Sequence, residues 1–240
     1  MSRLVVVTGG GRGIGRATAE RFAALGDRVV AVGRHAAAPE GVDCRVCDIT
    51  DEEAVGALFA DLGTVDVLVN NAGTADSAPL HRTTLATWRR LLEVNATGAF
   101  LCTRAVIGGM RERGKGRIVT VASTAGRVGV PYTAAYTASK HAAVGLMRAA
   151  AAELAGSGVT ANAVCPTFVD TDMTRESVAR IAERTGRSPS EGAAALAGAS
   201  PLGRLLEPGE VAAAVVWLAS EEAAAINGQT VVLDGGGIQT

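Results

Sequence analysis

Aromatic side chains are scarce in this chain, at 3% of its 240 residues, and long apolar runs are absent. The run from Val211 to Ala219 is much shorter than the roughly 20 residues that a membrane span needs. The opening run, Leu4 to Val7, passes directly into a glycine turn, which is not the pattern of a signal peptide. We therefore expect no membrane association and a cytoplasmic location.

Net charge is also nearly absent, because 23 basic and 24 acidic residues leave −1. Such a balance creates no field to attract nucleic acid, so nucleic acid is not expected as a partner. The four cysteines include one CxxC, Cys44 to Cys47, but no second pair at zinc spacing, and no metal site is expected. With 48% hydrophobic and 20% charged residues, the chain has the composition of a globular domain.

Strand-like runs alternate with helix-like stretches along the chain. Because parallel strands need crossover connections, this alternation predicts an α/β fold. We expect one Rossmann-like, doubly wound parallel sheet in three α-β-α layers within a single domain, residues 1–240. The predicted strands are Leu4 to Thr8, Arg28 to Val32, Cys44 to Cys47, Val65 to Val69, Arg117 to Val121, Val159 to Val164 and Thr230 to Leu233.

Three predicted helices bear on the later argument. One ends at Leu62 and opens on a capping box of Thr50 and Glu53. One spans Thr84 to Arg113, weakened by Gly98 and Gly108, and one spans Ala134 to Ala155. Residues 172–200 interrupt the alternation and are expected to form a substrate lid, since ligands bind at the carboxyl ends of such strands.

A glycine-rich turn follows the first strand, with the spacing GxxxGxG. Glycine lets backbone amides approach a pyrophosphate, and the N-terminus of the following helix adds a favourable dipole. The turn therefore predicts a dinucleotide site. Its expected contacts are Gly9, Gly11, Arg12, Gly13, Ile14 and Gly15.

The end of the second strand carries Arg34 and His35 and no carboxylate. An acidic residue there is typical of NAD sites, because it binds the ribose 2′-hydroxyl. Arg34, with Arg12, can instead contact a 2′-phosphate, which favours NADP(H) over NAD(H). Asp48, beside Ile49 after the third strand, either accepts from the adenine amine or caps the next helix. Asp48 and Ile49 are both included among the expected cofactor contacts.

Tyr136 and Lys140 stand four residues apart at the start of a predicted helix, so they share one face. A nearby ammonium favours the phenolate and lowers the pKa of a tyrosine, towards the range useful for acid-base catalysis. Lys140 can also bind the nicotinamide ribose. Ser123 ends the fifth strand and either donates to a substrate carbonyl or forms a turn. Asn95, a poor helix former, is a candidate for a proton relay to Lys140.

These motifs together resemble the short-chain dehydrogenase/reductase family over nearly the whole chain. Thr8 to Gly15 matches its TGxxxGxG, and Asn70 to Gly73 its NNAG. The resemblance implies that Tyr136 is the general acid and base, with Ser123 positioning the carbonyl. The tetrad it implies is Asn95, Ser123, Tyr136 and Lys140, and the further cofactor contacts are Asn71, Ala72, Gly73, Pro166, Val169 and Thr171. Thr167 departs from the glycine usual after Pro166.

The resemblance further implies a small-molecule carbonyl or alcohol substrate and a homotetramer joined through the helix that carries Tyr136. A 3-oxoacyl thioester or a polyketide-like ketone is favoured, free or linked to CoA or a carrier protein. Four arginines either contact such an anionic group or form a solvated helix face: Arg127, Arg175, Arg180 and Arg184. The alternatives are an NAD-linked secondary-alcohol dehydrogenase of the same fold and a non-catalytic NADP(H)-binding regulator.

Overall fold

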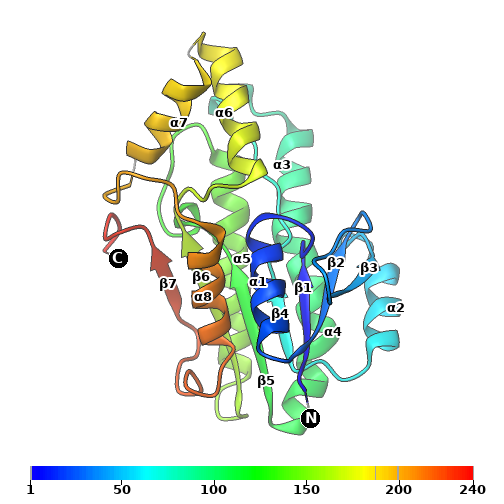
Figure 1. Cartoon of the computed structure of the whole chain (residues 1–240). Coiled ribbons are helices and arrows are strands. Elements are labelled where there is room, and N and C mark those ends of the chain that lie inside the picture. The colour runs from blue at the N-terminus through cyan, green and yellow to red at the C-terminus, as the bar shows by residue number, and fades with distance from the viewer. Residues whose placement is uncertain (1, 187, 199, 240) are drawn as a thin grey trace.

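The computed structural model describes residues 2–186, 188–198 and 200–239, and its architecture is a three-layer α-β-α sandwich (Figure 1). Seven strands form one parallel sheet in the order β3-β2-β1-β4-β5-β6-β7. The predicted fold class is confirmed. The strands are β1 (Leu4–Thr8), β2 (Arg28–Gly33), β3 (Asp43–Val46), β4 (Val67–Asn70), β5 (Gly116–Val121), β6 (Val159–Pro166) and β7 (Thr230–Leu233).

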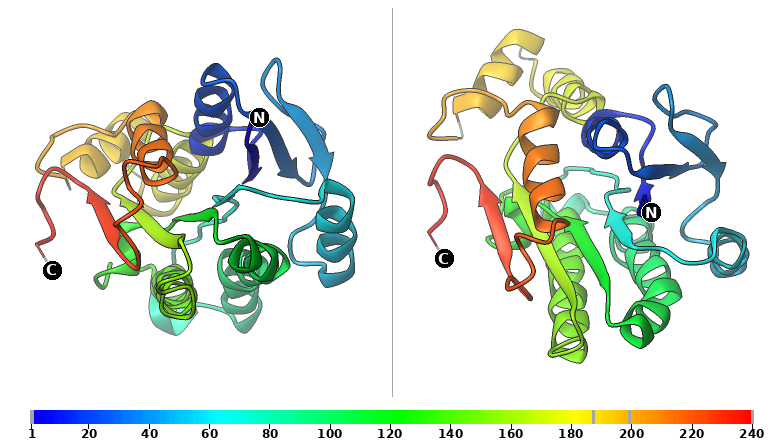
Figure 2. Two further views of the ribbon diagram at one scale, coloured as in Figure 1. Left: turned by 90° about the horizontal axis from the view of Figure 1, so that it is seen from below. Right: turned by 60° about the horizontal axis from the view of Figure 1, so that its bottom comes forward.

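Helices cover both faces of the sheet (Figure 2). They are α1 (Gly13–Ala24), α2 (Glu52–Leu62), α3 (Leu85–Leu92), α4 (Gly98–Arg113), α5 (Ala134–Glu153), α6 (Asp172–Thr185), α7 (Pro189–Gly198) and α8 (Pro208–Leu218). Alternate residues of β1 enter two separate cores, since successive strand side chains point to opposite faces. Val5 and Val7 pack with α1 and α8, whereas Leu4 and Val6 pack with α2, α4 and α5.

The strand order reverses between β1 and β4, and the carboxyl ends of all strands share one edge. In doubly wound sheets, ligands bind in the crevice at such a reversal. Figure 1 shows α6 and α7 rising above this edge, the upper one in that view. The sheet therefore places the glycine turn, the NNAG segment and the end of β5 side by side.

One predicted helix feature is wrong. Asp51, not Thr50, caps α2 by accepting from the Ala54 amide, because the Thr50 hydroxyl donates to Asp48 at 2.8 Å instead. The prediction that Thr84 to Arg113 is mostly helical is confirmed, since α3, a π-helical turn at Glu93–Thr97 and α4 follow one another without a break. Gly98, expected to weaken this helix, is instead required by packing: a Cβ there would lie 2.5 Å from Ile49 Cδ1.

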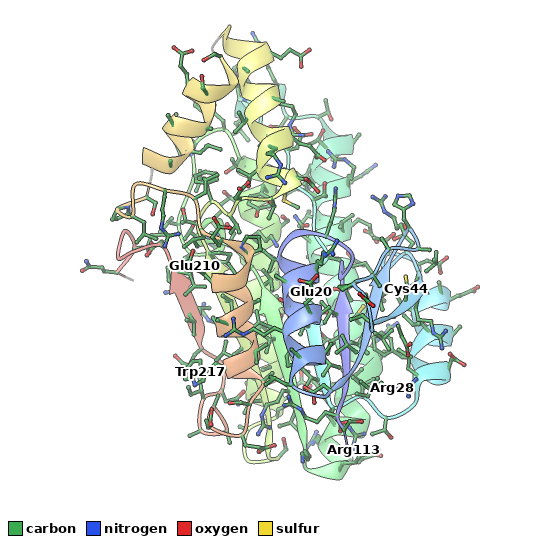
Figure 3. All side chains as sticks on the ribbon, viewed as in Figure 1. Glu20, Arg28, Cys44, Arg113, Glu210 and Trp217 are labelled. Carbon is green, nitrogen blue, oxygen red and sulfur yellow. The ribbon has the colours of Figure 1, made fainter. Side chains whose placement is uncertain are left out.

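The surface carries two features visible in Figure 3: Trp217 on the outer side of α8, and Cys44 on the edge strand β3. All four cysteines are free thiols. No helix within the described ranges has the length and apolar character needed to cross a bilayer. Those same ranges hold no group of three or more metal-binding side chains.

Candidate active site

The glycine turn between β1 and α1 is shaped by close backbone approach. Gly9 has φ of 66°, and a Cβ at Gly15 would lie 2.2 Å from the Gly9 carbonyl oxygen. The N-cap of α1, Arg12, makes no side-chain capping bond, so the first amides of the helix remain available as donors. A tight turn with uncapped amides fits the pyrophosphate of a dinucleotide.

The NNAG segment ties β4 to this turn. Asn71 donates from Nδ2 to the carbonyl oxygens of Thr8 and Gly9, at 2.9 and 3.2 Å. The Thr8 hydroxyl accepts from the amides of Asn71 and Ala72, both at 3.0 Å. Asn71 therefore joins the end of β4 to the end of β1. Gly73 continues the chain towards Lys140, whose Nζ would lie 3.5 Å from a Cβ at that glycine.

The side chains expected at the adenosine end lie at the carboxyl ends of β2 and β3. Arg34 and His35 are exposed, and no carboxylate follows β2 directly. The Asp48 carboxylate accepts from the Thr50 amide at 3.0 Å, which together with the Thr50 hydroxyl and Arg34 lowers the pKa of Asp48. Asp48 therefore shapes a turn and does not cap α2. The Ile49 side chain is buried against Gly98 and does not face solvent.

Ser123, Tyr136 and Lys140 converge just beyond the end of β5. The Ser123 side chain is close enough to the Tyr136 hydroxyl to favour its phenolate, and Ser123 also caps the short turn that follows it. Lys140 lies one helical turn after Tyr136, with its Nζ 5.8 Å from the centre of the tyrosine ring. The Nζ donates to the carbonyl oxygen of Val121 at 3.0 Å. The predicted shared helix face is therefore confirmed.

The electrostatics of this cluster differ from the prediction. Burial raises the pKa of Tyr136, and the nearby Ser123 side chain only partly opposes this effect. Burial also lowers the pKa of Lys140 to about 8. The expected lowering of the Tyr136 pKa by the Lys140 ammonium is wrong for this arrangement, because desolvation dominates and Lys140 bonds to Val121. Cys165, a fully buried thiol, adds to the rise at Tyr136.

Asn95 lies in the π-helical turn and is 3% exposed. Its Oδ1 accepts from the Thr74 amide at 2.8 Å, and its Nδ2 donates to the Thr74 carbonyl at 2.9 Å. Nδ2 also donates to the Ser139 hydroxyl, again at 2.9 Å. Asn95 therefore joins the loop after NNAG to the helix that carries Tyr136 and Lys140. A Cβ at Gly73 would lie 3.1 Å from Asn95 Oδ1, which places Asn95 beside Lys140.

The loop after β6 meets the glycine turn. Thr171 caps α6, and its Cγ2 would lie 3.1 Å from a Cβ at Gly13. The Val169 side chain is buried in the core, and the strand-like pairing with Leu206 uses its neighbours' backbone groups. Among the described residues, the Val169 amide has no partner, which suits a carboxamide oxygen. Pro166 ends β6 and starts this loop.

Comparison with known families decides the identity. The family profile described as enoyl-(acyl carrier protein) reductase matches residues 9–237. The chain belongs to the short-chain dehydrogenase/reductase family. It is accordingly an oxidoreductase that acts on CH–OH groups and uses a nicotinamide cofactor.

Individual members of this family align over almost the whole chain. The 3-oxoacyl-[acyl-carrier-protein] reductase MabA of Mycobacterium tuberculosis is 40% identical, over 98% of this chain and 93% of the relative. Acetoacetyl-CoA reductase of Shinella zoogloeoides is 37% identical, over 98% of each. A structure of an actinorhodin polyketide ketoreductase variant with NADPH has a TM-score of 0.91 and 37% identity, over 98% and 97% of the two chains.

One element of this site was not predicted from the sequence. Arg90, on α3, donates to the Thr74 hydroxyl at 3.2 Å and to the Asp76 carboxylate at 2.9 Å. The same loop continues to Ala78, whose amide donates to the Tyr132 carbonyl at 2.8 Å. Arg90 and Asn95 therefore hold the loop over the end of β4 from one side. The chain between Asp76 and Arg90 gives no periodic signal for such a contact.

Arg90→Gln is expected to raise the KM for the carbonyl substrate roughly tenfold, equivalent to ~1.4 kcal/mol, with little change in cofactor Kd. The reason is that glutamine cannot hold Thr74 and Asp76 together, so the loop beside the reacting carbonyl loses one tether. Steady-state kinetics and cofactor fluorescence titration measure the two constants. Arg89→Gln is the matched control, because Arg89 is exposed on the same helix. Equal effects from both variants would contradict the role of Arg90.

Proposed function

We propose that the protein is an NADP(H)-dependent reductase of ketones, with 3-oxoacyl thioesters or polyketide-like ketones as its substrate class. The observation that carries this proposal is the convergence of Ser123 and Tyr136 beyond the end of β5, with Lys140 on the same helix face as Tyr136. These groups lie at the sheet edge that also holds the uncapped glycine turn. The relatives' names, which describe 3-oxoacyl and acetoacetyl reduction, agree with this substrate class.

The proposed chemistry assigns a task to each side chain. The nicotinamide supplies the hydride when it is bound. Ser123 donates a hydrogen bond to the carbonyl oxygen, and the Tyr136 hydroxyl transfers its proton to that oxygen as negative charge develops there. Lys140 binds the cofactor ribose, and its ammonium, which is protonated below about pH 8, stabilises the phenolate as it forms. Asn95 holds the loop at Thr74 against the helix that carries Lys140. In this position it supports the transfer of a new proton to Tyr136 through Lys140.

The proposed cofactor contacts are the residues placed at this edge. The amides of Gly9 to Gly15, with Arg12 and Ile14, bind the pyrophosphate. Asp48 and Ile49 lie beside the adenine, and Asn71, Ala72 and Gly73 beside the ribose. Pro166, Val169 and Thr171 face the carboxamide. In this proposal α6 and α7, within residues 172–200, form the lid, and four chains assemble through α5.

Arg34→Ala is expected to lower kcat/KM for NADPH roughly 10- to 100-fold while changing the value for NADH less than about threefold. The reason is that a charge-assisted bond to the 2′-phosphate contributes ~1.5–3 kcal/mol, and only NADPH carries that group. Arg45→Ala is the control, because Arg45 is exposed on the neighbouring strand and pairs with Asp61. A wild-type preference for NADH would defeat the NADP(H) assignment and favour the NAD-linked dehydrogenase.

The substrate class is tested by a panel of 3-oxoacyl thioesters, cyclic ketones, quinones and sugars, followed at the nicotinamide absorbance. We expect the highest kcat/KM with the thioesters. Cofactor binding without turnover of any compound would favour the non-catalytic regulator. Sedimentation of the purified chain measures whether it is a tetramer.

A further inference from the structure

The arginines near the proposed lid differ in what they bind. Arg175 donates to both Asp170 and Asp172, at 2.9 Å for the latter, so its charge is already neutralised. Arg127 donates to the Thr230 hydroxyl on the far strand β7. The Arg184 side chain lies outside the described part of the structure. Arg180 is the exception: its one hydrogen bond to a described group is from Nη2 to the Ser177 hydroxyl, at 2.9 Å.

The guanidinium of Arg180 is unsatisfied in two respects. Its Nε is buried and has no hydrogen-bond partner among the described residues. No carboxylate within the described ranges pairs with it. A charged, partly buried donor is unfavourable unless an anion or an acceptor meets it. Arg180 lies on α6, the helix above the sheet edge that holds Ser123 and Tyr136 (Figure 1).

The contacts of α6 show which side of the helix carries Arg180. Glu176 pairs with Arg12 of the glycine turn at 3.7 Å. Val178 packs against Gly192 of α7, since a Cβ added at Gly192 would lie 3.2 Å from Val178 Cγ1. Residues three, four or seven apart share a helix face, so Met173, Ser177 and Arg180 form one stripe. This stripe lies on the side of α6 between Glu176 and Val178, and its side chains are half-buried. Arg175 and Ala179, on the opposite side of the helix, are exposed.

We propose that Arg180 binds an oxyanion carried by the substrate, beyond its reacting carbonyl. Arginine fits a carboxylate or a phosphate with two parallel hydrogen bonds, one of them from Nε, and this is the group left without a partner. The inference rests on the proposed ketone reductase and narrows its substrates to those with a negative charge. The anion is the carboxylate of a keto acid or a phosphate of an acyl-CoA.

The test pairs each anionic ketone with a neutral counterpart. One pair is 4-oxocyclohexanecarboxylate and its methyl ester, and the other is acetoacetyl-CoA and the N-acetylcysteamine thioester of acetoacetate. Arg180→Gln is expected to lower kcat/KM for the anionic member of at least one pair by roughly 10- to 100-fold. The neutral member should change less than about threefold. The responding pair identifies whether a carboxylate or a phosphate is bound.

Binding is measured separately from turnover, by thermal-shift titration of each anionic ketone with cofactor present. Arg180-dependent binding without reduction would support this anion site and overturn the proposed function. Reduction of the anionic ketones with no dependence on Arg180 would overturn the anion site and leave the reductase intact. Arg175→Gln is the matched control, an exposed arginine on the same helix that is already paired. Equal losses for charged and neutral ketones in Arg180→Gln would show a structural effect and also overturn the site.

Discussion

Tyr136→Phe is expected to reduce kcat by about 10²–10⁴-fold while leaving the Kd for the cofactor within about twofold of the wild type. Phenylalanine keeps the ring and its packing but removes the hydroxyl that transfers the proton. The developing alkoxide then lacks its proton donor. Single-turnover nicotinamide oxidation and fluorescence titration measure the two quantities.

The chain provides its own control for this experiment, since it has two tyrosines. Tyr132 lies four residues earlier and is 67% exposed. Tyr132→Phe should retain most of the wild-type rate. A Tyr136→Phe enzyme that kept more than about a tenth of its rate would remove this hydroxyl from the mechanism, because general acid-base catalysis contributes at least that much.

The parts of the site that were predictable are local in sequence. Tyr136 and Lys140 are one helical turn apart, so any helix over this segment places them on one face. Gly9 and Gly15 bracket a strand–turn–helix junction, whose geometry is fixed within a few residues. The order of motifs along the chain then placed each one at the carboxyl edge of a strand.

The parts that were missed depend on distant contacts. Lys140 meets the Val121 carbonyl, Arg90 meets Asp76, and Asn95 meets Ser139, and none of these pairs shares a repeating pattern. The pKa shifts of Tyr136 and Lys140 were missed for the same reason, because they follow from burial by the whole fold. A sequence shows that an ammonium stands near a phenol, but not that desolvation outweighs their attraction.

Lys140→Met is expected to abolish turnover and, at pH 7, to stabilise the folded chain. Burial lowers the pKa of Lys140 from 10.5 to about 8. Below pH 8 the lysine is protonated in both the folded and unfolded states, and the folded state carries the full unfavourable free energy of a buried charge. A shift of this size corresponds to about 3 kcal/mol, and the hydrogen bond to Val121 offsets about 1 kcal/mol of it. The variant should therefore gain about 2 kcal/mol.

The gain should depend on pH with a defined sign. As pH rises from 8 to 10.5, Lys140 loses its proton in the folded state but keeps it in the unfolded state, so the wild type gains stability over this range. The difference between wild type and Lys140→Met should accordingly narrow. Urea unfolding at pH 7 and pH 9.5, at one fixed protein concentration, measures this difference.

Lys115 is the control for this prediction, because the chain has two lysines and this one is exposed near Glu221. Lys115→Met should change neither turnover nor unfolding by much, since exposed ion pairs contribute at most about 1 kcal/mol. If Lys140→Met were instead less stable at pH 7, the buried amine would be held by contacts stronger than its desolvation. Lys140 would then stabilise the folded chain in addition to any catalytic role. A stable but inactive variant would show that the chain keeps an unfavourable buried charge because catalysis requires it.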